Sequence, residues 1–281
     1  MNQPLFSVLI TNYNNGRYLQ EAIDSVLAQT YTNWEIILVD DKSTDNSFEI
    51  YEKYKDDGRF KIYYNEVNMG CGYTKHRCAE LASGELCGFL DPDDTLLPNA
   101  LEVHVKKHCE NPEISCVLSR HYVCDSKLNI VSPSRLLSLS DAETYFSHRD
   151  YNPEHFVSYK KVVYKKTEGL ATDIPKGVDQ DLIFKLEEVA PVCVLDALTY
   201  KYRVHPKGVS QDMIETAVYW NLVVRHRTCI RRGLNPSEYP VKDFIDFWRG
   251  KYNEGKNFIK LSRAYQLGCC LLKPLSWMFK N

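Results

Sequence analysis

The sequence lacks the signatures of several common protein classes. No G-x-G-x-x-G follows the first apolar segment, which argues against a dinucleotide dehydrogenase, and no GxxxxGK[ST] occurs, which argues against a P-loop NTPase. None of the ten cysteines falls in a CxxC pair, and most lie within apolar runs. We therefore interpret them as core residues of a protein in a reducing compartment. The net charge of −2 does not indicate nucleic acid binding, and none is expected.

A secretory leader is also lacking at the start of the sequence. Residues 1–4 carry no basic group, and the apolar run 6–10 is too short for the core of a signal peptide. We expect a cytoplasmic protein, or one attached to the cytosolic face of a membrane. The length of 281 residues suits one large domain, or one domain with a sizeable appendage. With 44% hydrophobic and 26% charged residues, the composition is that of an ordinary globular protein.

Apolar segments of strand length alternate with helical patterns over the first hundred residues. The expected strands are 6–11, 34–39, 60–65 and 86–90, and the expected helices are 19–27, 46–54 and 73–82. Strands that are apolar along their whole length indicate a mostly parallel sheet covered on both faces by helices. In such sheets, ligands bind outside the carboxyl ends of the strands.

Three polar clusters follow three of these strands: Thr11 to Asn14, Asp40 with Asp41, and Asp91 to Asp94. Three carboxylates as close as those of 91–94 repel one another, and Mg²⁺ or Mn²⁺ is the usual partner of such oxygen ligands. The site would then suit a phosphate-bearing ligand. The plain alternative is a polar loop in which Asp94 or Thr95 caps the helix that Pro98 opens.

Six segments resemble, in order and spacing, the family 2 glycosyltransferases. They are Ser7–Asn14, Ser25–Tyr31, Glu35–Asp45, Asn68-x-Gly70, Ala82–Glu85 and Leu90–Asp94. The likeness runs from about residue 6 to 110 and returns more weakly at Asp179 and at 202–210. It implies an α/β fold of the GT-A nucleotide-diphosphosugar transferase type, with a mostly parallel central sheet flanked by helices. We expect a donor half at 1–110, an acceptor and catalytic half at 111–210, and a helical extension at 211–281.

The resemblance also implies roles at the donor site. Thr11 and Tyr13 would form the edge of the nucleotide pocket, and Asp41, with Asp40 beside it, would contact the base. Asp91 and Asp93 would be the two acids of the DxD motif that hold Mn²⁺ or Mg²⁺, with Asp93 the direct ligand.

Further roles follow from the same resemblance. Lys75 replaces an arginine that commonly faces the donor, and a lysine is a point charge rather than a bidentate fork. Asp179 aligns with the catalytic base, although Val178 replaces the usual preceding glutamate; the alternative is an acid that complements the helix dipole. Arg203 and His205 would meet the diphosphate or the metal, or else serve as structural residues.

The second half of the chain has a different pattern. A hairpin is expected from strands 114–124 and 128–131, and 156–164 is expected to be a strand. The polar stretch 132–153 would suit an acceptor-binding loop. Helices are expected from Gly177 onward and over 214–232.

Basic and apolar residues are interleaved in residues 251–281. The segment contains six lysines or arginines and a single glutamate. Lys273 and Pro274 interrupt its apolar run before that run reaches the roughly 20 residues of a membrane span. This segment would either lie on a membrane surface or pack on the main domain.

The resulting hypothesis is a metal-dependent, inverting glycosyltransferase of the hexosyltransferase kind. It would move a sugar from a nucleotide-sugar, with UDP favoured, to a hydroxyl of a glycan or glycolipid acceptor in surface polysaccharide or lipid-linked glycan synthesis. One alternative is a nucleotidyltransferase of the same fold, but residues 11–16 hold no lysine or arginine to bind a triphosphate. The other is a catalytically inactive protein that binds sugar nucleotides.

Overall fold

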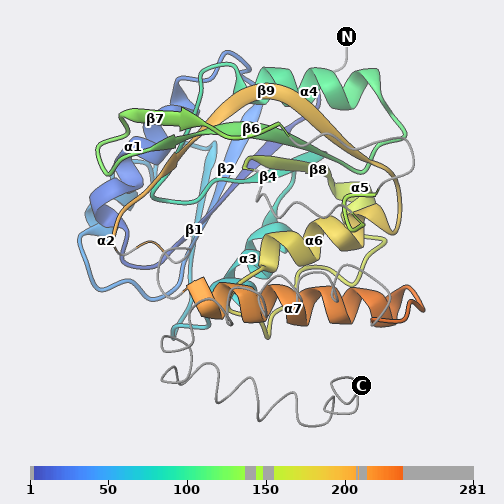
Figure 1. Ribbon diagram of the computed structural model, residues 1–281. Coiled ribbons are helices and arrows are strands. Elements are labelled where there is room, and N and C mark those ends of the chain that lie inside the picture. The colour runs from blue at the N-terminus through green and yellow to red at the C-terminus, as the bar shows by residue number, and fades with distance from the viewer. Residues whose placement is uncertain (1–2, 137–143, 148–154, 207, 209–213, 237–281) are drawn as a thin grey trace.

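The computed structural model describes residues 3–136, 144–147, 155–206, 208 and 214–236. One sheet lies between two layers of helices (Figure 1). The strands are β1 (Phe6–Asn12), β2 (Trp34–Asp40), β3 (Phe60–Tyr64), β4 (Leu86–Phe89), β5 (Thr95–Leu96), β6 (Cys116–Cys124), β7 (Ile130–Pro133), β8 (Val157–Lys160) and β9 (Val192–Arg203). The helices are α1 (Gly16–Leu27), α2 (Ser47–Tyr51), α3 (Cys71–Leu81), α4 (Ala100–Glu110), α5 (Lys161–Tyr164), α6 (Val178–Glu187) and α7 (Ile214–Arg231).

The strand order is β3-β2-β1-β4-β8-β6-β9-β5, with β7 paired to β6 at the side. The first four strands of this order run parallel, as their apolar sequences predict. β8 runs antiparallel to both β4 and β6, whereas β6 and β9 are parallel to each other. The sheet is therefore parallel over β1 to β4 and mixed over β5 to β9.

The two faces of the sheet bury separate apolar cores. Helices α1, α2 and α4 pack on one face, against alternate residues of β1 and β2 such as Val8 and Ile36. Helices α3 and α6 pack on the other face, against Leu9 and Ile37, which are the intervening residues of the same strands. Because successive side chains of a strand point to opposite faces, one unbroken apolar run serves both cores.

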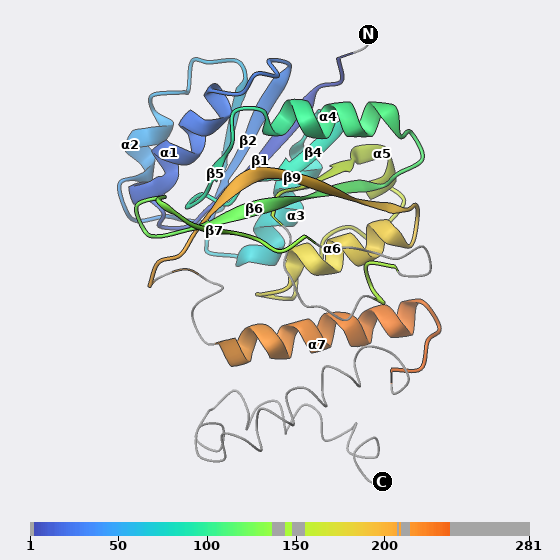
Figure 2. The ribbon, with the colours of Figure 1, turned by 45° about the horizontal axis from the view of Figure 1, so that its top comes forward.

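Helix α7 extends the second layer. It lies along α6, as Figure 2 shows, and Arg231 contacts the buried carboxylate of Asp181 and the carboxylate of Glu188. This part of the expected extension therefore packs on the main domain. The basic stretch 251–281 lies outside the described residues. Among the residues that the model does describe, no helix is long and apolar enough to cross a bilayer.

Two expectations about the elements were wrong. The stretch 156–164 is a strand only as far as Lys160, because β8 pairs with β4 and β6 over 157–160 and the chain then turns into α5, where Val162 is 62% exposed. Helix α4 begins at Ala100 rather than at Pro98, and neither Asp94 nor Thr95 caps it, since Thr95 belongs to β5. The hairpin β6–β7 and the acids in the first turn of α6 are confirmed. The stretch 137–143 and the stretch 148–154, which include most of the expected acceptor loop, are outside the described residues.

Candidate active site

The expected ligand edge of the sheet is formed by the carboxyl ends of β1, β2 and β4. Asn12 and Asp40 are partners in the β1–β2 register, and the loop after β4 carries the DxD acids. Tyr13 is 49% exposed just beyond β1, and Thr11 is partly exposed at its end. Their place at the rim of a nucleotide pocket stays a prediction.

The two neighbouring aspartates after β2 are buried and hydrogen-bonded within the protein. Asp41 accepts hydrogen bonds from the side chain of Asn65 at 2.7 Å and from the backbone N–H groups of Met69 and Gly70 at 2.8 Å each. Gly70 has a φ of 83°, which a residue with a side chain rarely adopts. Asp41 thus shapes the loop before α3, and its contact with a base stays a prediction.

Asp40 has a structural set of partners of its own. Its carboxylate accepts from the Tyr51 hydroxyl at 2.6 Å and from the Ser43 N–H at 2.8 Å, and it is 4% exposed. These contacts tie β2 to α2. They favour a role in holding the loop over direct contact with a ligand.

The three acids of the DxDD segment have different partners. Asp91 Oδ1 lies 3.3 Å from Lys75 Nζ, and Asp93 Oδ2 lies 2.8 Å from His205 Nε2. Burial alone would raise the pKa of Asp91, but the charge of Lys75, the nearby His155 and the hydrogen bond with Lys75 together lower that pKa below its ordinary value. Burial and the nearby charge of Asp91 raise the pKa of Asp93, against the hydrogen bond with His205.

Asp94 is a structural carboxyl, which the sequence did not distinguish from its neighbours. It is 1% exposed, and it accepts hydrogen bonds from the backbone N–H of Arg203 at 2.6 Å and from the Tyr200 hydroxyl at 2.8 Å. Burial, together with the charges of Asp93 and Asp91, raises its pKa well above the ordinary value. Asp94 and Tyr200 therefore anchor the acidic loop to β9.

The predicted base meets the DxD motif through a lysine. Asp179 Oδ1 lies 2.8 Å from Lys75 Nζ, so one ammonium contacts Asp91 and Asp179 at once. Burial alone would lower the pKa of Lys75, but the two carboxylates outweigh it and raise that pKa well above its ordinary value. The structure thus brings together three residues that the sequence assigned to the donor site and to catalysis.

Arg203 is placed differently from its predicted contact with a diphosphate. Its guanidinium donates to the backbone oxygens of Asp93 and Ser126 at 2.6 and 3.0 Å, and to Glu21 at 3.0 Å. The residue is 2% exposed. These contacts favour a role in positioning the acidic loop.

His155 is a site residue that the sequence analysis did not single out. Its ring stacks on Tyr202, with centroids 4.8 Å apart, and on Tyr200, with centroids 5.5 Å apart. Burial lowers its pKa, although Asp91 and Asp179 are near enough to oppose this shift. No pattern in the sequence marks this histidine, because its neighbours come from β9, more than forty residues later.

The residues present fit a hard divalent cation that shares its coordination with a substrate. No group of three or more histidine, cysteine or acidic side chains forms a metal centre within the described residues. Asp93 and His205 nevertheless offer an oxygen and a nitrogen 2.8 Å apart, with Asp91 two residues away. Mg²⁺ is commonly held by one or two carboxylates together with substrate phosphates, and Asp93 and Asp91 are carboxylates of this kind.

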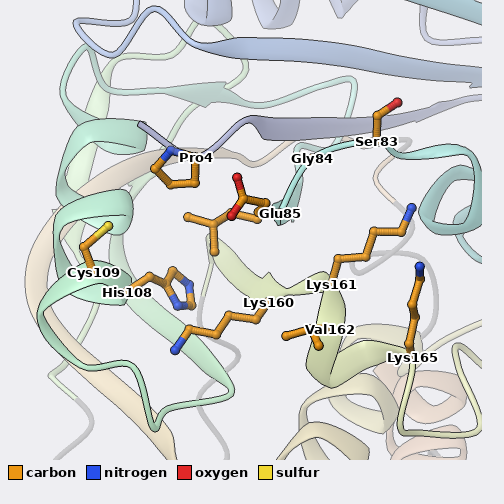
Figure 3. A pocket seen from close by; sticks show the side chains of 11 residues that line it. Pro4, Ser83, Gly84, Glu85, His108, Cys109, Lys160, Lys161, Val162 and Lys165 are labelled. Atoms are coloured by element: carbon orange, nitrogen blue, oxygen red, sulfur yellow. The ribbon is translucent and has the colours of Figure 1, made fainter. Parts of the chain in front are cut away.

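A cavity of about 440 Å³ lies at the other edge of the sheet, before β1 and β4 (Figure 3). Its lining includes Glu85, His108, Lys160 and Lys161. The Lys160 ammonium donates to the backbone oxygen of Asn111 at 3.0 Å, and that of Lys161 donates to the backbone oxygen of Ala82. These lysines stabilise the segments after α4 and α3, and the cavity is separate from the acidic site.

Known proteins similar to this chain have related names and folds. Residues 7–167 match the family model described as glycosyl transferase family 2. The chain is 27% identical over 236 residues to the chondroitin synthase of Escherichia coli, covering 84% of this chain and 34% of that protein. It is 36% identical over 118 residues to the putative teichuronic acid biosynthesis glycosyltransferase TuaG of Bacillus subtilis, covering 42% of this chain and 46% of that one. The chain thus spans about a third of the length of the first relative.

Solved structures support the predicted fold. S. aureus TarS 1–349 in complex with UDP superposes with a TM-score of 0.68 at 20% identity, covering 92% of this chain and 75% of that one. The mannosyltransferase PcManGT from Pyrobaculum calidifontis, in complex with GDP-Man and Mn²⁺, superposes with a TM-score of 0.63 at 14% identity, covering 99% and 76%. The α/β fold of the GT-A type is confirmed. Because the family model covers more than half of the sequence, this chain belongs to glycosyl transferase family 2.

Proposed function

We propose that this chain is an inverting glycosyltransferase that moves a sugar from a nucleotide-sugar to an acceptor hydroxyl. The observation that carries the proposal is the contact of Lys75 with both Asp91 and Asp179, at 3.3 and 2.8 Å. It puts a candidate base beside the acidic motif at the carboxyl ends of the strands, where ligands of such sheets bind.

In the proposed reaction, Asp179 accepts the proton of the acceptor hydroxyl. The oxygen of that hydroxyl forms a bond to C1 of the sugar on one face, while the bond from C1 to the diphosphate oxygen breaks on the other. The bonding electrons leave with the nucleoside diphosphate, and the configuration at C1 is inverted. Mn²⁺ or Mg²⁺, held by Asp93 with Asp91 and His205, would neutralise the charge of the departing diphosphate.

For the donor we favour UDP, and for the acceptor a growing polysaccharide or a lipid-linked glycan. The support is the name of the chondroitin synthase relative and of the teichuronic acid relative, together with the UDP and UDP-GlcNAc of the TarS complexes. The GDP-Man in the PcManGT complex makes GDP the first alternative to test. A cytoplasmic site of action and a membrane contact through residues 251–281 belong to the same proposal.

The test is calorimetric binding of UDP and GDP, each with and without Mn²⁺, to the wild type and to Asp93→Ala. We expect Mn²⁺-dependent binding of UDP that is lost in Asp93→Ala and kept in the control Asp56→Ala, which changes an exposed aspartate in the loop before β3. Release of UDP from a UDP-sugar, accelerated by an oligosaccharide acceptor and lost in Asp179→Asn, would then support transfer. Binding of neither nucleotide would contradict the proposal, and binding without turnover would favour the inactive sugar-nucleotide-binding protein.

A further inference from the structure

The Lys75 side chain is 5% exposed, and its ammonium lies between two carboxylates from distant parts of the chain. It donates to Asp179 Oδ1 and lies near Asp91 Oδ1, and its Nζ is 5.0 Å from the centroid of the Phe89 ring. An ammonium has three donors and no acceptor, so it can orient two carboxylates at once. The buried ammonium of Lys75 thus connects α3, the DxD loop and α6.

Asp179 depends on this contact for its orientation. Its side chain is 51% exposed, and solvent alone would allow it several rotamers. The backbone below it is fixed, because Lys185 forms a buried ion pair of 2.6 Å with Asp181 in the same helix and also donates to the Gly169 oxygen. The remaining freedom is that of the Asp179 carboxylate, which Lys75 holds by one oxygen.

We propose that Lys75 is a positioning residue for Asp179, and that this is its main role. It holds Oδ1, so that the other carboxylate oxygen faces the solvent side, where an acceptor hydroxyl arrives. The same ammonium contacts Asp91, which lies on the leaving-group side of the proposed reaction. Lys75 therefore also keeps Asp179 at a constant distance from Asp91. This inference rests on the proposed function of Asp179. It differs from the donor-facing role that the family resemblance implies.

The burial of Lys75 supports this assignment. A diphosphate that approached the ammonium would have to share it with the two carboxylates to which it is already paired. Two carboxylates share one cation, so the loss of Lys75 would leave two like charges near each other with nothing between them. The base would then lose both its orientation and its partner.

The experiment compares Lys75→Met, Lys75→Arg, Asp179→Asn and the double variant Lys75→Met with Asp179→Asn. We expect Lys75→Met to lower kcat about 100-fold, as a misplaced catalytic group does, and to change the Kd for UDP with Mn²⁺ less than about threefold. Because both residues act through one carboxylate, the double variant should be no slower than Asp179→Asn alone. Lys75→Arg, which keeps a cation, should recover part of kcat.

Lys61→Met is the control, since it also removes a lysine from an ion pair, here one of 2.6 Å with the buried carboxylate of Glu35 at the edge of the sheet away from the acidic site. We expect it to lower the melting temperature as Lys75→Met does, with kcat per folded molecule close to that of the wild type. If Lys75→Met does not fold, Lys75→Arg carries the test: a normal kcat with UDP affinity weakened about tenfold would assign Lys75 to the donor and overturn the inference. Full activity of Asp179→Asn would refute the proposed base itself, whereas an inactive Asp179→Asn beside a fully active Lys75→Met would refute only the role of Lys75.

Discussion

His205 Nε2 lies 2.8 Å from Asp93 Oδ2, and this contact joins two residues that are 112 positions apart. The ring of Tyr18 packs against the imidazole, with centroids 4.9 Å apart, which fixes the orientation of His205 toward the carboxylate. The end of β9 therefore completes the acidic motif that begins after β4.

Replacing His205 by alanine should lower the Mn²⁺ affinity of the proposed metal site. Loss of a metal ligand or of its hydrogen-bonding partner typically costs 10- to 100-fold in metal affinity, so we expect the Mn²⁺ concentration for half-maximal activity to rise about tenfold or more. Titration of the initial rate with Mn²⁺ measures this. His226→Ala in α7 is the control, and an unchanged Mn²⁺ curve for His205→Ala would exclude His205 from the metal site.

Tyr200→Phe should destabilise the acidic loop. The change removes the hydroxyl that donates to Asp94 and accepts from the Asp91 N–H at 3.3 Å, and it leaves buried polar groups unpaired. We expect a loss of about 1–3 kcal/mol in the free energy of unfolding, measured by urea denaturation. Tyr159→Phe is the matched control, because that buried hydroxyl has no partner stronger than the Cys87 thiol and its removal should cost little. Equal losses in the two variants would contradict the anchoring role of Tyr200.

Gly72→Ala should destabilise the protein, although alanine normally favours a helix. A Cβ at this position would lie 2.5 Å from the Ala171 oxygen and 2.7 Å from the Ile174 oxygen, and backbone atoms cannot easily move away. We expect a cost of about 1–3 kcal/mol and a lower kcat, since α3 carries Lys75. Gly58→Ala is the control because nothing lies within 4 Å of its Cβ. A stabilised Gly72→Ala variant would show that the loop 171–174 can move away.

The stability of the fold should fall as the pH drops below about 6.5. Burial lowers the pKa of His104 and of His108 to about 3, and their rings share the Ser158 hydroxyl. Between pH 6.5 and 3 the unfolded chain binds protons that the folded chain does not, so each histidine costs about 1 kcal/mol of unfolding free energy per pH unit.

Urea denaturation of the wild type and of His104→Gln at pH 7.0 and 5.5 tests this prediction. At pH 7.0 the variant should be the less stable protein, because it loses the histidine contacts with Ser158 and Ser119. At pH 5.5 the difference between the two free energies of unfolding should be smaller by about 1 kcal/mol, because only the wild type has to keep His104 neutral in the folded state. Parallel losses in both proteins would contradict the assignment.

Strands β1 to β4 and the helices between them could be predicted from the sequence because their signals are local. Each strand there is apolar along its length, and each helix shows its own spacing, as α1 does with Leu19, Ala22, Ile23 and Val26 buried. The rest of the sheet depends on contacts between distant segments. β5 has only two residues and exists because Thr95 and Leu96 pair with Lys201 and Tyr200 of β9. No pattern within two residues can predict such a strand.

The acidic residues of the site could be predicted from the sequence, whereas the residues that contact them could be predicted less well. The position of Asp91 and Asp93 after an apolar strand is visible in the sequence, and the resemblance alone pointed to Asp179. The contact of Lys75 with both Asp91 and Asp179 cannot be predicted from the sequence, because Lys75 and Asp179 are 104 positions apart. The inward direction of Arg203 and the stacking of His155 likewise depend on tertiary packing.

The pairing of β8 with both β4 and β6 has a consequence for how the substrates meet. Donor and acceptor halves share one hydrogen-bonded sheet, so they cannot swing apart on a hinge without breaking the ladder that connects them. In the proposed reaction, an opening that admits a sugar or releases a nucleotide would therefore come from loops at the edge of the sheet and not from a hinge between its strands. Substrate binding and product release should accordingly depend on short segments that can rearrange while the rest of the protein stays folded.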